Sequence, residues 1–372
     1  MMWTYKNPVK IMFGNGHFLT LPAMIAGRSY ALVTYPDSPF EDLTAQLVAK
    51  AGKPEVIIND ITPNPDISLL ADQSARFADL AEIPEVIVAL GGGSVIDSAK
   101  VFAAAAGDFS KVLHFLQTKT GEEALSAVPI IAVPTTAGTG SEVTCWATVW
   151  DEENGRKFSL AREALYSEVA LIDPALMLGK SYGLTLVTAL DALSHSIESI
   201  WNVNANPVSA RHAVAAARAI LRDLPKLLGD LGNLDLRNSI AEASLNAGLA
   251  FSNTKTAIAH NISYPITLGW GVQHGIACSF TLPTILQSVI GTGGFREESL
   301  NAIFGDDLTK GADNLQAFLK QFGVGHRFTD HKIPPESFQA IVDEAFVGDR
   351  GKNFIGAKES LLEAAIQRGV IK

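Results

Sequence analysis

The stretch Glu85-Val-Ile-Val-Ala-Leu90-Gly91-Gly92-Gly93-Ser94, which continues into Val95-Ile96-Asp-Ser-Ala-Lys100, decides the fold. Its apolar, β-branched first part predicts a buried strand, and its last part predicts a helix. The three glycines between them let backbone amides approach an anion closely, at a helix N-terminus that favours negative charge. Ile96 occupies the third glycine position of the pattern G-x-G-x-x-G. The residues alone therefore leave open a phosphate-binding turn and a simple tight turn.

The rest of the first half repeats this alternation. Apolar runs at 29–34, 55–58 and 128–133 predict further buried strands, and helix-like stretches at 40–52 and 66–81 lie between them. Strands that alternate with helices are typical of a parallel, doubly wound sheet of the Rossmann-like α/β class. Ligands of such sheets bind beyond the carboxyl ends of the strands.

The pattern changes after Leu171-Ile-Asp-Pro-Ala-Leu-Met177, and we predict no strand from Gly183 onward. Helical periodicity dominates this second half. The stretches concerned are 184–202, 207–228, 236–252, 256–267 and 338–346. We therefore predict an α/β domain over residues 1–178 and an all-α domain over residues 179–372.

Composition narrows the class of protein. The chain has 372 residues, 47% hydrophobic and 18% charged, with a formal net charge of −10; this is ordinary for a globular protein of two domains. No cluster of Lys and Arg indicates a nucleic-acid partner. Cys145 and Cys278 cannot form a disulfide framework, which favours a reducing compartment. The start lacks the apolar core of a signal peptide, and no apolar run is long enough to span a membrane. We expect a cytoplasmic protein without a membrane partner.

Two short apolar segments carry four polar side chains. Asp191 and His195 lie in 189–199, where helical spacing places both side chains on one face, one turn apart. His260 and His274 belong to the second segment. A buried aspartate or histidine needs a partner, and one divalent cation would satisfy all four. The alternative is an Asp–His hydrogen bond with two core histidines bonded to backbone, but the two segments together favour a metal site.

A second polar stretch follows the strand that ends at Val133. It reads Pro134-Thr135-Thr136-Ala-Gly-Thr139-Gly-Ser-Glu-Val-Thr144, with hydroxyl groups and glycines where a buried strand terminates. Carboxyl ends of parallel strands are where such sheets bind ligands, so these residues are candidates for a cofactor site. A plain surface loop is the alternative.

These motifs resemble those of the iron-containing (group III) alcohol dehydrogenases. The resemblance rests on Asp-x3-His followed by His-x13-His and on Pro-Thr-Thr-Ala-Gly-Thr-Gly-Ser-Glu, and it extends along most of the chain. It implies a dehydroquinate synthase-like architecture with one divalent metal, Fe(II) by family habit and zinc as a substitute. The implied metal ligands, which are also the catalytic residues, are Asp191, His195, His260 and His274.

The resemblance also implies a nicotinamide cofactor. Gly91, Gly92, Gly93 and Ser94 would hold its pyrophosphate, Thr135, Thr136 and Thr139 would lie near phosphate and nicotinamide, and Lys157 would reach a ribose. Many NAD-preferring members have an aspartate where this chain has Tyr35, with Asp37 two residues on. An acidic residue there repels a 2′-phosphate. NAD and NADP therefore both stay open.

The substrate is indicated less sharply. Phe251 aligns with a family aromatic that lines the substrate pocket, and a core phenylalanine is the alternative. Tyr264 stands where many members carry a further histidine near the substrate. The stretch 199–207 (Ser-Ile-Trp-Asn-Val-Asn-Ala-Asn-Pro) resembles the phosphonoacetaldehyde reductase branch. A phosphonate would require a cationic partner or several amide donors. Candidates by proximity to the motifs are Arg162, Arg211 and Lys255.

Together these features predict a metal-dependent, NAD(P)-linked alcohol dehydrogenase or aldehyde reductase. It would act on a small aldehyde or primary alcohol, such as phosphonoacetaldehyde, and we expect a homodimer. The alternatives are a glycerol-type polyol dehydrogenase and a dehydroquinate-synthase-like lyase. Such relatives typically lack a ligand at the position of His195, so the full set of four argues against both. A non-enzymatic binding protein would leave the metal residues and the two loops without a purpose.

Overall fold

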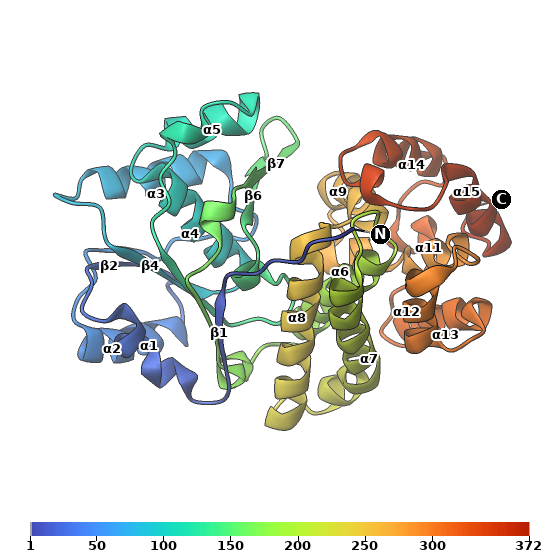
Figure 1. Cartoon of the computed structure of the whole chain (residues 1–372), viewed down its shortest axis with the longest axis horizontal. Helices are drawn as coiled ribbons and strands as arrows, with labels where there is room; N and C mark the ends of the chain where they lie inside the picture. Colours follow the sequence, from blue (N-terminus) through green and yellow to red (C-terminus); the bar gives the residue numbers. More distant parts are fainter. Residues whose placement is uncertain (1, 372) are drawn as a thin grey trace. The chain divides into compact units, whose positions relative to one another are not determined.

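The computed structural model describes residues 2–371, which form two compact units (Figure 1). The sheet unit comprises residues 7–136 and 140–178, and the helical unit comprises residues 2–6, 137–139 and 179–371. The chain thus leaves the sheet unit for three residues at 137–139. Thr139, expected at the cofactor, belongs to that excursion and is grouped with the helices.

The sheet unit is built on six parallel strands in the order β1-β8-β5-β4-β2-β3. Their bounds are β1 Lys10–Phe13, β2 Tyr30–Val33, β3 Val56–Ile58, β4 Val86–Gly91, β5 Ile130–Pro134 and β8 Val169–Ile172. A separate antiparallel hairpin joins β6, Trp146–Asp151, to β7, Arg156–Ala161. The parallel α/β sheet predicted from the sequence is confirmed, and β2 to β5 are the four predicted strands.

Helices cover both faces of this sheet because its strands are buried on both sides. Alternate residues such as Ala31 and Val33 pack with α3 to α5, whereas Tyr30 and Leu32 pack with α1 and α2. The helices are α1 Leu21–Ile25, α2 Phe40–Ala51, α3 Ile67–Ala78, α4 Gly93–Ala105 and α5 Phe109–Thr118. The sheet is therefore doubly wound, as expected.

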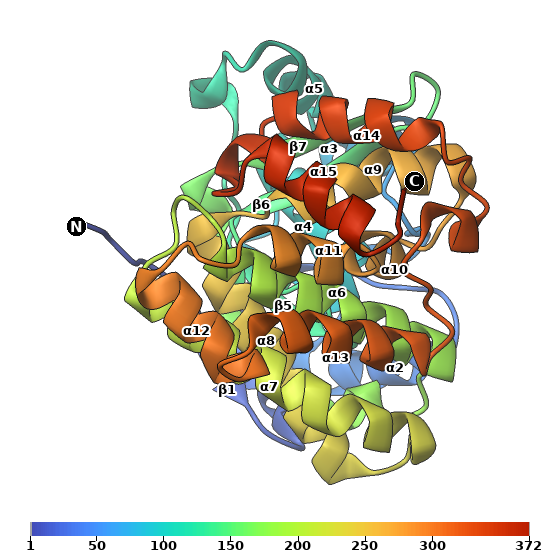
Figure 2. The same cartoon turned by 90° about the vertical axis from the view of Figure 1, so that its right-hand side faces the viewer.

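Ten helices form the helical unit in the part of the chain that the structure describes, and no strand joins them. They are α6 Tyr182–Ile200, α7 Pro207–Gly229, α8 Leu234–Thr254, α9 Ile258–Trp270, α10 His274–Ser279, α11 Leu282–Ser288, α12 Gly294–Phe304, α13 Leu308–Lys320, α14 Ser337–Val347 and α15 Lys358–Gln367. Helices α6 to α9 and α14 lie where helical periodicity predicted them. Figure 2 shows α12 to α15 from the side on which they lie in front of α6 and α8.

Helix α7 shows how local sequence starts an element here. Asn206 is its N-cap and accepts from Val208 and Ser209 N–H, while Ser209 Oγ accepts from Asn206 N–H. Pro207 occupies N1, where its missing N–H costs no hydrogen bond. The segment from Trp201 to Asn206 is thereby held between two helices, with the Trp201 ring fully buried.

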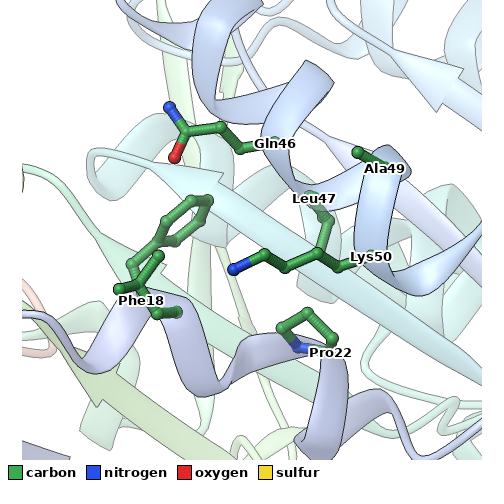
Figure 3. A pocket seen from close by; sticks show the side chains of 7 residues that line it. Phe18, Pro22, Gln46, Leu47, Ala49 and Lys50 are labelled. Atoms are coloured by element: carbon green, nitrogen blue, oxygen red, sulfur yellow. The ribbon is translucent and has the colours of Figure 1, made fainter.

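Seven short 3-10 segments complete the description. They are η1 His17–Thr20, η2 Glu122–Ala124, η3 Ser141–Val143, η4 Glu163–Leu165, η5 Pro174–Met177, η6 Phe328–His331 and η7 Gly351–Asn353. Between η1, α1 and α2 the sheet unit has an apolar pocket of about 230 Å³, lined by Phe18, Pro22 and Leu47 beside the Lys50 amine (Figure 3). It includes none of the site residues predicted from the sequence. No helix within residues 2–371 is long and apolar enough to cross a membrane.

Candidate active site

One carboxylate oxygen in the helical unit faces three imidazoles. Asp191 Oδ1 lies 3.4 Å from His260 Nε2, 3.7 Å from His195 Nε2 and 3.8 Å from His274 Nε2. Asp191 and His195 are one turn apart on α6, His260 lies in the first turn of α9, and His274 begins α10. The structure thus brings together all four residues that the sequence predicted as metal ligands.

The approach of α10 to α6 depends on Gly275. A β-carbon added there would lie 1.8 Å from the carbonyl oxygen of Val187. Any side chain at this position would therefore push α10 away from α6 and carry His274 away from Asp191. His274 thus supplies an imidazole, and Gly275 beside it lets this imidazole approach Asp191.

Glu198 is a functional candidate that the sequence reasoning missed. Its side chain is fully buried, and Oε1 accepts from the Ala259 and His260 N–H groups at 2.7 and 3.2 Å. Oε2 accepts a short hydrogen bond from His260 Nδ1. A carboxylate behind a histidine fixes the ring and its tautomer, as is usual for metal-binding histidines. The available signal was a glutamate three residues after His195 on an apolar helix.

The tautomer set by Glu198 leaves His260 Nε2 facing Asp191. This nitrogen is buried and has no hydrogen-bond partner among residues 2–371. With the proton on Nδ1, a neutral His260 points its lone pair at a carboxylate oxygen, which is unfavourable unless a cation lies between them. A proton can bridge only one histidine nitrogen to Asp191 Oδ1, whereas a divalent ion can bind the oxygen and all three nitrogens. The residues present therefore fit a metal.

Burial and charge set the protonation of these groups. Burial lowers the pKa of His195 to about 4, against the opposing effect of Asp191. For His260, burial acts to lower the pKa, but the Glu198 and Asp191 carboxylates outweigh it and the pKa is raised. The pKa of Asp191 is lowered, because the nearby histidines outweigh its burial. The Asp191 carboxylate and the neutral His195 imidazole both suit a divalent ion, and such an ion would replace the proton that the two carboxylates favour on His260.

Cys278 is a further group at this centre. Asp191, His260, His274 and Cys278 each offer one ligand atom within 4.8 Å of the others. The buried Cys278 Sγ lies 3.6 Å from Asp191 Oδ1 and 3.5 Å from the Gly275 carbonyl oxygen. Burial raises the pKa of this thiol well above its ordinary value. Cys278 lies one helical turn after His274, and this spacing is the signal that could have identified it from the sequence.

Aromatic rings flank the histidines. Phe251 stacks on His195 with centroids 4.1 Å apart, and His195 stacks on His260 at 4.5 Å. Phe251 is 4% exposed, and its ring supports that of His195; its role toward a substrate stays a prediction. Tyr264 stacks on the partly exposed ring of His274 at 6.1 Å.

In the sheet unit, the two predicted loops lie side by side. Gly91 pairs with Pro134 at the carboxyl ends of β4 and β5, and the Thr135 N–H donates to the Gly91 carbonyl at 2.9 Å. A β-carbon on Gly91 would lie 2.5 Å from a Val95 methyl group, so the turn into α4 requires glycine. Helix α4 starts at Gly93. The sheet thus presents a helix N-terminus beside a threonine-rich loop.

Hydroxyl groups surround this helix start. A β-carbon on Gly92 would lie 3.2 Å from Thr136 Oγ1, so Thr136 lies directly over the turn. Thr135 Oγ1 is buried and has no hydrogen-bond partner in the described part of the chain. Ser94 forms a side-chain hydrogen bond with Tyr35 beyond the end of β2. An unsatisfied hydroxyl beside free helix amides fits an anionic cofactor group.

Lys157 lies on β7, in the separate hairpin and not in the sheet that carries these glycines. Its amine is 5.0 Å from the centroid of the Trp150 ring. Burial raises the pKa of Asp97, and the charge of Lys157 is among the effects that oppose this rise. Asp97 belongs to α4, the helix that follows the glycine turn.

Comparison with known proteins shows which family the chain belongs to. A family model described as iron-containing alcohol dehydrogenase matches residues 8–174, and its C-terminal counterpart matches residues 185–365. The chain is 32% identical to 1,3-propanediol dehydrogenase of Klebsiella pneumoniae, over 82% of this chain and 78% of that protein. It is 32% identical to phosphonoacetaldehyde reductase of Streptomyces viridochromogenes, over 73% and 72% of the two chains.

A solved structure is similar over the whole length. Sulfoacetaldehyde reductase from Bifidobacterium kashiwanohense, in complex with NAD+, is 28% identical with a TM-score of 0.88, covering 100% of this chain and 99% of that one. The two family models together match most of both units. The chain therefore belongs to the iron-containing alcohol dehydrogenase family, and it is a metal-dependent oxidoreductase of that type.

Proposed function

We propose that this chain transfers hydride between NAD and a small aldehyde or primary alcohol. Asp191, His195, His260 and His274 would hold one divalent ion. The observation that carries the proposal is the convergence of three Nε2 atoms on Asp191 Oδ1, with the buried His260 Nε2 lacking a hydrogen-bond partner among the described residues.

The family, and not the donor set, supports iron first. Imidazole nitrogen and carboxylate oxygen suit Fe(II) and also Zn(II), and the family name is that of an iron enzyme. A divalent ion at this position supplies Lewis acidity toward a carbonyl or alcohol oxygen. The chain contributes the orientation of the ligands: Glu198 holds His260, Phe251 supports His195, and Gly275 admits His274.

The cofactor proposal rests on the glycine turn. Gly91, Gly92, Gly93 and Ser94 with Thr135 and Thr136 would receive the pyrophosphate at the start of α4. The unsatisfied Thr135 hydroxyl supports this assignment, and a solved relative contains NAD+. The roles of Thr139 and Lys157, and the use of NADP, remain predictions, as does a homodimer, which light scattering on the purified protein would test.

A substitution tests the turn directly. Gly92→Val would press against Thr136 Oγ1, because even a β-carbon lies 3.2 Å from it. We expect the KM for NADH to rise about tenfold or more, with metal content unchanged, since the glycines serve close approach to phosphate. Gly183→Val is the matched control, because a β-carbon at Gly183 meets no atom within 4 Å. Equal NADH binding by both variants would show that the turn is only structural.

The substrate we propose is a small aldehyde that carries an anionic group, such as phosphonoacetaldehyde. Support comes from the similarity to a phosphonoacetaldehyde reductase and to a sulfoacetaldehyde reductase. The deciding assay compares phosphonoacetaldehyde, sulfoacetaldehyde, propanal and glycolaldehyde with NADH and with NADPH, on protein of measured metal content. Oxidation of glycerol in preference to any primary alcohol would instead favour a polyol dehydrogenase.

A further inference from the structure

Tyr264 connects the metal centre to an arginine that sequence analysis did not single out. Its ring stacks on His274 with centroids 6.1 Å apart and planes 10° from parallel. The guanidinium carbon of Arg350 lies 5.7 Å from the centroid of the same ring. Arg350 is thus one aromatic ring away from a histidine whose side chain is 34% exposed, the most open of the four proposed ligands.

The chain holds Arg350 in this position. Its Nη1 donates to Thr256 Oγ1 at 2.7 Å, and the Thr256 side chain also hydrogen-bonds with Tyr264. The Asn353 amide donates to the Thr256 carbonyl at 2.9 Å. A β-carbon on Gly351 would lie 1.9 Å from the Ala345 carbonyl oxygen, so the turn after α14 packs closely against the helix end. The guanidinium is therefore pre-organised.

Segment 199–207, which resembles phosphonoacetaldehyde reductases, is hydrogen-bonded to the turn after α14. Val203 N–H donates to the Asn353 carbonyl at 2.8 Å, and Ile355 N–H donates to the Trp201 carbonyl at 3.3 Å. Asn202 Nδ2 donates to the Lys255 carbonyl at 3.1 Å, beside Thr256. The stretch from Trp201 therefore bonds to both chain segments that position Arg350, which gives it a structural connection to the site.

Arg350 carries a charge that the chain does not neutralise. No carboxylate among residues 2–371 lies within ion-pair distance of its guanidinium. Its neighbour Asp349 is fully exposed and pairs with Lys352 at 3.4 Å. A guanidinium has five N–H donors in a planar fork, and the Thr256 hydroxyl accepts from only one nitrogen. A partly buried cation of this kind fits a tetrahedral oxyanion.

We propose that Arg350, together with Thr256, forms an anion subsite at the Tyr264 ring that selects aldehydes bearing a phosphonate or sulfonate group. The inference rests on the proposed function, because it assigns a binding role within that site. The aldehyde carbon would lie toward the metal residues and the anionic group toward Arg350. Neutral aldehydes would gain nothing from this contact.

The three cations suggested by the sequence are less suited to this role. Arg162 is in the sheet unit, where it donates to the Ser126 and Leu125 carbonyls and pairs with Glu122. Arg211 lies with two other arginines in an open groove of about 620 Å³ between α7 and α12. Lys255 is next to Thr256, but its side chain is exposed.

The test compares wild type with Arg350→Gln, Arg350→Lys and the control Arg211→Gln, which removes an exposed arginine from the same unit. For Arg350→Gln we expect kcat/KM to fall about 30-fold or more with phosphonoacetaldehyde and sulfoacetaldehyde, and less than about threefold with propanal. Arg350→Lys should retain part of the preference, because it keeps the charge but loses the fork. Arg211→Gln should behave as wild type.

Two further results separate this subsite from the proposed function. Titration calorimetry with phosphonoacetate, which carries the anionic group but is not an aldehyde, should show binding to wild type and weaker binding to Arg350→Gln. If wild type reduces no aldehyde, the proposed function fails, and this titration alone decides the anion subsite. An equal loss with propanal, an unchanged preference in Arg350→Gln, or equal phosphonoacetate binding would overturn the inference.

Discussion

Lys100 in the sheet unit and Asp191 in the helical unit are both buried charges, but the chain surrounds them differently. Lys100 Nζ donates to four oxygens between 2.7 and 3.1 Å, two of them carbonyls and two hydroxyls. Asp191 instead faces imidazole nitrogens at 3.4 to 3.8 Å, beyond good hydrogen-bond distance. A charge satisfied by its own chain indicates structure. A buried charge that faces a nitrogen without a hydrogen-bond partner among residues 2–371, as Asp191 faces His260 Nε2, indicates a ligand from outside.

The largest expected effect concerns the metal residues. His274→Ala should reduce bound metal from one ion per chain to below about 0.1 and abolish activity, because one of the four proposed ligands is lost and the solvent-exposed side of the site opens. Elemental analysis of dialysed protein measures this. His114→Ala, at an exposed position of α5, is the control and should retain full metal. Full occupancy in His274→Ala would show that the histidine cluster is structural.

Lys100→Met tests whether the hydrogen bonds around the buried Lys100 stabilise the fold. It keeps the length of the side chain but removes its charge, which leaves the partly buried Asp97 and four oxygens without their cation. We expect a loss of about 3–5 kcal/mol in the free energy of unfolding. Chemical denaturation measures it, with Lys111→Met at a surface pair as control. A loss below about 1 kcal/mol would mean that the network contributes little to stability.

A smaller loss of metal affinity is expected from a change at Glu198, which contacts the proposed ligand His260 and not the ion itself. Glu198→Gln keeps an oxygen for the Ala259 and His260 N–H groups but removes the negative charge that holds His260 Nδ1–H. We expect metal affinity to fall about 10- to 100-fold while the protein stays folded. Competition with a chelator gives the affinity, and Glu242→Gln on the exposed face of α8 is the control. Equal affinity in the two variants would exclude a role for Glu198 in metal binding.

The smallest effect is a pH dependence in the Lys100 region. Burial raises the pKa of Glu142 from 4.5 to about 7, against the opposing charge of Lys100. Because the folded protein favours the protonated form, its contribution to stability is present below pH 4.5 and is lost as the pH rises through about 7. Glu142→Gln should therefore gain stability relative to wild type between pH 5 and pH 8, on the order of 1–2 kcal/mol. A difference that does not change with pH would contradict this.

Short-range sequence patterns were sufficient to predict many of the strands and helices. The apolar runs of β2 to β5 and the helical periodicity of α6 to α9 predicted those elements. Both signals are visible within a few consecutive residues, as an apolar run for a buried strand and as a 3.6-residue period for an amphipathic helix. The same reasoning missed β1, which has only four residues at a sheet edge and no buried side chain. It also missed β8, whose four residues run directly into the predicted domain boundary.

What the sequence alone determined about the site was likewise local: the i, i+4 pair Asp191 and His195, and the glycine turn before α4. Only the tertiary structure decided which distant groups meet. Glu198 reaches His260, 62 residues away, and Arg350 reaches Thr256, 94 residues away. Spacing along a chain specifies neighbours within one helix or one turn. Contacts between separate helices depend on how whole faces pack, and a single glycine such as Gly275 can decide how closely they approach.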